Sequence, residues 1–142
     1  KRFAVAAREA QRLGARIVLG DRAVSVTLRR LAEALRKTPL DSFQALNDAL
    51  SGAVSAPDDL DAAGLAVWVE RLKQRKVVRA TMAVVKENVP EVYAAMVGER
   101  DEFMANSIRQ SGGTRVVAVV GMAHLDGLER NLGYKQLACR LW

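Results

Sequence analysis

The sequence RVVAVVGMAH, residues 115–124, determines the fold that we predict for this chain. Its apolar run at 116–120 does not alternate with polar residues, so it predicts a strand covered on both faces, as in a parallel sheet. Gly121 follows the run, and a glycine permits the sharp turn that ends a strand. We therefore expect His124, the only histidine of the chain, at the carboxyl end of this strand, where open α/β sheets bind ligands.

A second strand is expected at residues 16–19, where RIVL is followed by a glycine and then by Asp21 and Arg22. If the two strands are parallel neighbours, their carboxyl ends meet at one edge of the sheet. This arrangement would place Asp21 and Arg22 beside His124. In the simpler alternative, Asp21 only caps the next turn and Arg22 is solvated.

The remaining elements follow from apolar periodicity. Apolar residues that recur every three or four positions predict helices, at residues 2–13, 28–37, 41–54, 55–72, 70–87, 90–109 and 125–132. Two further short strands are expected at residues 24–27 and 136–141. Together these elements predict an α/β fold, with a central, largely parallel sheet and surrounding helices, in a single domain over residues 1–142.

The helix expected at 90–109 carries two charged residues of interest. At 100° per residue, Met96 and Phe103 fall on one apolar face, Arg100 projects into it and Glu99 lies at its edge. A buried guanidinium needs a carboxylate or a ligand, because an unpaired buried charge is very costly. Either Glu99 and Arg100 form a structural pair, or the helix lies beneath the strand ends and offers one of them to a pocket.

Composition excludes several classes of function. The net charge is +6, but the basic residues are dispersed along the chain and only 5% of residues are aromatic, so we expect no nucleic-acid partner. A single cysteine allows no internal disulfide. No apolar run reaches the roughly 20 residues of a membrane helix, so an anchor would lie outside this chain. The chain starts with KRFAVAAREAQ and no methionine, and we expect it to be part of a longer protein.

Three blocks of the sequence resemble the TraB-domain family, also called TraB/PrgY/GumN and related to the Tiki proteins. The blocks are GARIVLGDRAVSVTLRRL, VGERDEFMA and VVAVVGMAHLDGLERNL, in this order and at plausible distances. The family has two Gly-x-x-His elements, and the C-terminal one is similar to residues 121–124. The N-terminal element has no counterpart here, so the chain resembles the C-terminal part of the domain, incomplete at its N-terminus.

The resemblance implies a fold and an activity. The fold would be the α/β fold of erythromycin-esterase and ChaN-type proteins, and Tiki relatives are described as metal-dependent proteases. The resemblance thus implies a metal-dependent hydrolase of peptides, with His124 and Glu99 as ligands of Mn²⁺, Co²⁺ or Zn²⁺. Glu99, Arg100, Asp21 and Arg22 would be the catalytic residues. Without the resemblance, a lone histidine after a strand is more often a hydrogen-bonded structural residue.

The family also suggests a function of another class. Intracellular eukaryotic members are linked to organelle membranes, particularly the mitochondrial outer membrane, and the GDR and TLRR blocks look closest to that branch. By this resemblance the chain would be a non-catalytic binding or tethering domain, intracellular and facing the cytosol at such a membrane. Under either hypothesis the expected partner is a peptide or a protein.

Overall fold

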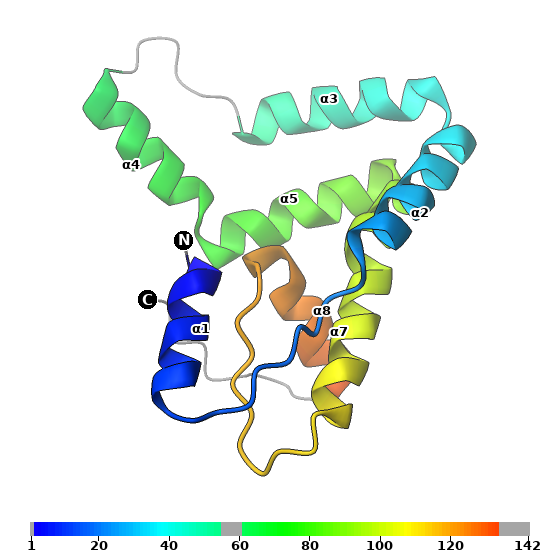
Figure 1. Cartoon of the computed structure of the whole chain (residues 1–142). Coiled ribbons are helices and arrows are strands. Elements are labelled where there is room, and N and C mark those ends of the chain that lie inside the picture. Colours follow the sequence, from blue (N-terminus) through cyan, green and yellow to red (C-terminus); the bar gives the residue numbers. More distant parts are fainter. Residues whose placement is uncertain (1, 55–60, 134–142) are drawn as a thin grey trace.

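The structure is a computed structural model that describes residues 2–54 and 61–133, and the described chain is built from helices without any strand (Figure 1). The elements are α1 (Arg2–Arg12), α2 (Val24–Lys37), α3 (Leu40–Val54), α4 (Ala62–Leu72), α5 (Arg75–Asn88), α6 (Pro90–Tyr93), the π-helical turn η1 (Ala94–Gly98), α7 (Glu99–Gln110) and α8 (Met122–Leu132).

The core of the described chain lies where α7 packs against α8 (Figure 1). Three buried side chains form its centre and three partly buried ones surround them: Met104, Ala105 and Leu128, then Ile108, Val120 and Leu132. Helix α5 contacts α8, and α3 contacts α5. Helix α2 contacts α6 and η1, and η1 and α7 both contact α8, so packing holds together the elements that carry the residues of interest.

The turn η1 joins α6 to α7 without a break in the helix. It begins at Ala94, and the backbone N–H of Glu99 donates to the carbonyl oxygen of Ala94, five residues back. A π-turn contains one residue more than the α-helical pattern provides, so the residues after it face a different direction from that given by a constant 100° step. This shift determines which side of α7 is buried.

The predicted α/β fold with a central parallel sheet is wrong, because the described residues contain no strand. The runs at 16–19 and 116–120 are extended, but neither forms a backbone ladder with a neighbouring strand among the described residues. Leu19 and Val117 are 92% and 90% exposed. An apolar run becomes a strand only when a neighbour pairs with its backbone N–H and C=O groups, and no segment within 2–54 or 61–133 does so here.

The other two predicted strands have different outcomes. Residues 24–27 form the first turn of α2, where Val26 and Thr27 donate their backbone N–H groups to the carbonyl oxygen of Ala23. The helical periodicity of the rest of α2 thus extends through this β-branched segment, which shows that tertiary and helical context override a weak propensity. The strand predicted at 136–141 lies outside the described residues.

Candidate functional site

The first three residues of α7 are all charged, and each has a different partner. Glu99 contacts arginines of the segment that leads into α2 and of α2 itself, Arg100 contacts Asp21, and Asp101 contacts His124 of α8. Because η1 directly precedes them, their directions depend on the π-turn. The start of α7 therefore joins the 21–23 segment, α2 and α8.

Glu99 lies between two guanidinium groups. Arg22 Nη1 donates to Glu99 Oε2 over 2.6 Å, and Arg30 Nη2 donates to Oε1 over 2.6 Å. The Arg22 side chain is only 9% exposed, and its Nη2 also donates to the carbonyl oxygen of Ala95 in η1. The hydrogen bonds from Arg30 and then from Arg22 lower the pKa of Glu99 to about 2. Glu99 is therefore ionised at neutral pH and its two oxygens are both engaged.

Arg100 forms the second pair. Its Nη2 lies 2.6 Å from Asp21 Oδ2, its Nε donates to Asp21 Oδ1 over 3.2 Å, and its Nη1 donates to the carbonyl oxygen of Met96. This forked hydrogen bond from Arg100 lowers the pKa of Asp21. The predicted pair between Glu99 and Arg100 is thus replaced by two pairs that reach across to the 21–22 segment.

Asp101 and His124 form the most buried pair of the site. His124 Nδ1 lies 2.7 Å from Asp101 Oδ1, and the two residues are 9% and 0% exposed. The other carboxylate oxygen, Asp101 Oδ2, is buried and has no hydrogen-bond partner among the described residues. It lies against Gly127, where an added Cβ would come within 1.8 Å of it. The imidazole is therefore held through one nitrogen by a carboxylate that cannot easily move.

The structure places the residues predicted from the sequence around one end of α7. Asp21 and Arg22 lie against Arg100 and Glu99, and His124 contacts the next residue of α7. They meet through helix contacts instead of through the edge of a sheet.

Sequence reasoning missed two members of the cluster, Arg30 and Asp101. The position of Asp101, directly after Glu99 and Arg100 in a chain with one histidine, was the available signal for it. Arg30, one position after the exposed Arg29, gave no comparable signal.

The described residues do not fit a metal ion. They contain no group of three His, Cys, Asp or Glu side chains that could hold one. Of the two ligands implied by the resemblance, Glu99 has both oxygens bound by arginines, and His124 uses Nδ1 toward Asp101. Binding a divalent cation would require Glu99 to give up charge-assisted hydrogen bonds.

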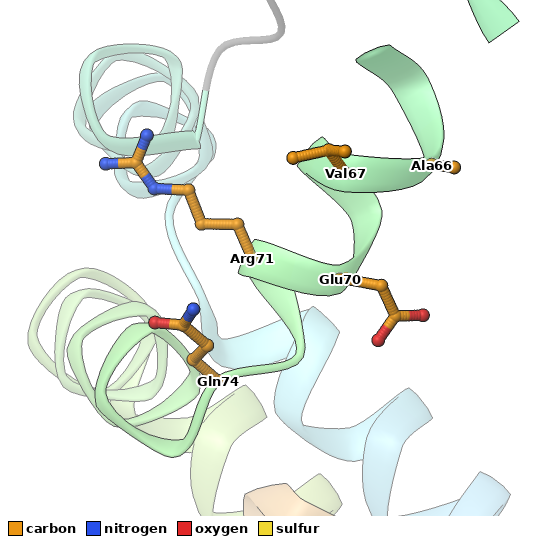
Figure 2. Close-up of a pocket in the computed structure, with 5 residues that line it drawn as sticks. All are labelled: Ala66, Val67, Glu70, Arg71 and Gln74. Atoms are coloured by element: carbon orange, nitrogen blue, oxygen red, sulfur yellow. The ribbon is translucent and has the colours of Figure 1, made fainter. Parts of the chain in front are cut away.

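A hollow in the described chain lies elsewhere, beside α4. It has a volume of about 530 Å³ and is lined by Ala66, Val67, Glu70, Arg71 and Gln74. In Figure 2 Glu70 points away from Arg71 and Gln74, so the polar groups do not converge on one point. A ligand site needs convergent polar groups, and we therefore place the candidate site at α7 and α8.

Comparison with known proteins identifies the family. Residues 2–135 match the TraB/PrgY/gumN family, and this range includes every residue of the site described above. The chain belongs to the TraB/PrgY/gumN family. It is 29% identical to a human TraB domain-containing protein over 135 residues, which cover 80% of this chain and 32% of that protein. The bovine TraB domain-containing protein gives 29% identity over 130 residues, with the same coverage.

An archaeal relative extends the comparison. An uncharacterised protein of Methanocaldococcus jannaschii is 31% identical over 126 residues, which cover 87% of this TraB-family chain and 29% of that protein. The chain thus spans about a third of the length of the curated relatives it matches. No solved structure matches it. Among the described residues, no helix is long and apolar enough to cross a membrane.

Proposed function

We propose that this chain supplies the acid–base part of a TraB-family hydrolase site, with His124 as the group that moves the proton. The observation that carries the proposal is the 2.7 Å contact between His124 Nδ1 and the buried Asp101. A carboxylate that accepts from Nδ1–H fixes the tautomer of the ring and leaves Nε2 able to accept a proton. In this arrangement His124 removes a proton from a water molecule at Nε2, and Asp101 stabilises the imidazolium that forms.

Arg100 has a supporting role in this proposal. Its side chain is 22% exposed and forms an ion pair with Asp21, which favours the charged guanidinium. Arg100 also directly precedes Asp101 in the sequence. A fixed guanidinium near a reacting carbonyl stabilises the negative charge that develops on oxygen. The family resemblance implies a metal-dependent peptidase, but the described residues do not gather the ligands, and we assign no step to a metal ion.

A non-catalytic binding or tethering domain is the second candidate. It is favoured by the charge compensation around Glu99, where Arg22 and Arg30 engage both carboxylate oxygens. Such a network holds α2 against α7 and needs no substrate to satisfy it. In this case Asp101 and His124 would be a structural pair with the same geometry and no turnover.

Peptide hydrolysis by this protein separates the two candidates. We expect cleavage of a mixture of quenched fluorescent peptides, and His124→Ala should lower kcat/KM by roughly 10²–10⁴-fold, the usual contribution of a general base. Arg29→Ala, on the exposed side of α2, should leave the rate unchanged. The assay is run with and without Mn²⁺, Co²⁺ and Zn²⁺. Absence of cleavage under all conditions, or equal rates with and without His124, would favour the tethering candidate.

A further inference from the structure

A second polar cluster lies on a face of α8 different from that of His124. A groove of about 170 Å³ runs between α5 and α8 and is bordered by Tyr93 of α6. Figure 1 shows these two helices next to each other at the centre of the chain, and their contacts confirm that they pack together. Val78 and Met82 of α5 and Met122 of α8 supply apolar lining. The lining of the groove thus combines apolar and charged residues.

The charges on this groove are mainly positive. It is lined by four cationic side chains and one carboxylate, namely Arg75, Arg79, Lys86, Arg130 and Asp126. Arg75 and Arg79 both bind Asp126, with 2.6 Å between Arg79 Nε and Asp126 Oδ2, and Arg79 remains 62% exposed. Lys86 and Arg130 form no ion pair with an acidic side chain of the described residues. A ligand with carboxylates would therefore complement this surface.

The size and shape of the groove indicate a peptide ligand. Its volume is below the roughly 300–1,000 Å³ of typical small-molecule sites, so it suits one or two inserted side chains better than an enclosed metabolite. Met82 and Met122 can adjust to side chains of different shape. A concave groove lined by both apolar and cationic residues also differs from the flat basic surface that a lipid headgroup layer contacts.

We propose that this groove binds an acidic amphipathic helix of a partner protein. Apolar side chains of that helix would insert beside Met82 and Met122, and its Asp or Glu residues would pair with Lys86 and Arg130. Helix α5 has 14 residues, so a partner helix of about four turns, roughly 20 Å long, would match it. The groove shares only Gly127 with the surroundings of Asp101, so this proposal does not depend on hydrolase activity.

Fluorescence anisotropy with a labelled designed peptide tests the proposal. The peptide has about four turns, leucines at i, i+3, i+4 and i+7, and glutamates on both sides of them. The double variant Lys86→Glu/Arg130→Glu should weaken binding by about tenfold or more, because two attractive contacts become repulsive. The control Arg29→Glu/Lys37→Glu makes the same charge change on exposed positions of α2, and should alter binding by less than about twofold.

Two further measurements test whether the ligand enters the groove. Ala83 lines it and is exposed, so Ala83→Trp should fill it and abolish binding while the helical circular dichroism is retained. A peptide with glutamine in place of glutamate should bind about tenfold more weakly. The proposal would be overturned if Lys86→Glu/Arg130→Glu and its control lost equal affinity for the peptide, or if Ala83→Trp bound the peptide as well as the original protein. It would also be overturned if phosphatidylserine vesicles bound through Lys86 and Arg130 and the peptide did not bind.

Discussion

Replacing Gly127 with alanine should destabilise the fold by about 3 kcal/mol. The new Cβ would lie 1.8 Å from Asp101 Oδ2 and 2.5 Å from its Cγ, well inside van der Waals contact. Asp101 is fully buried and held by His124, so it can move only by breaking that hydrogen bond. The variant would be measured by urea unfolding followed by circular dichroism.

Gly98→Ala is the matched control for this substitution. Gly98 is also helical, but its added Cβ would meet nothing closer than Tyr93 Cε1 at 3.9 Å. Gly98→Ala should therefore be as stable as the original chain, or up to about 1 kcal/mol more stable. Adding Asp101→Ala to Gly127→Ala should restore part of the stability, because the clashing carboxylate is removed. A Gly127→Ala protein of normal stability would contradict the close contact.

Glu99→Gln should have the second largest effect on stability, a loss of about 2 kcal/mol in the free energy of unfolding at neutral pH. The neutral amide leaves the nearly buried Arg22 without its carboxylate, although Glu99 is itself 31% exposed and solvent reduces the effect. Glu33→Gln is the control, since Glu33 pairs with the same Arg30 but at an exposed i,i+3 position. It should cost less than about 0.5 kcal/mol.

The same variant should change the acid sensitivity of the fold. The pKa of Glu99 is about 2 in the folded chain against 4.5 as its ordinary value, so its stabilising contribution is present above pH 4.5 and is lost as the pH falls toward 2. Glu99→Gln removes this contribution and should flatten the stability curve in that window. Part of the pH dependence of stability should remain in Glu99→Gln, because the pKa of Asp126 is lowered by Arg79 and then by Arg75. An unchanged slope in Glu99→Gln would show that Glu99 is not paired in solution.

The helices could be predicted from the sequence because their apolar residues repeat with helical spacing. The strands could not be predicted, because an apolar run such as 116–120 forms a strand only when another segment pairs with its backbone. The sequence of the run does not indicate whether such a segment lies beside it. The strand predicted at 24–27 was also wrong because of its context. The strong helical pattern that follows these β-branched residues extends over them.

The π-turn explains a second discrepancy. A constant 100° step places Phe103 on the buried face with Met96, yet Phe103 is 45% exposed, whereas Asp101 and Met104 are buried. The extra residue in η1 rotates everything after it, and sequence periodicity gives no warning of such a turn. For the same reason Arg100 does not enter the apolar arc. The side chain of Arg100 extends from α7 to Asp21, and Asp101 is the charged residue of this turn that is buried.

The predicted site residues came together for reasons of charge that are visible in the sequence. A buried or half-buried Glu99 and Arg100 had to find partners of opposite charge, and the GDR block supplied Asp21 and Arg22. The pairing of Glu99 with Arg22 and of Arg100 with Asp21 depends on the direction of each side chain after η1. Sequence spacing alone does not give these directions. Their roles in catalysis remain a proposal.

The tautomer of His124 shows whether Asp101 orients the ring as a general base requires. His124 is the only histidine, so a long-range ¹H–¹⁵N correlation spectrum shows its two ring nitrogens without overlap. For the neutral ring, we predict a protonated Nδ1, donating to Asp101, and an unprotonated Nε2, with Asp101→Ala shifting the ring toward the Nε2–H form. A predominant Nε2–H tautomer in the unmodified protein would rule out Asp101 as the acceptor that orients His124.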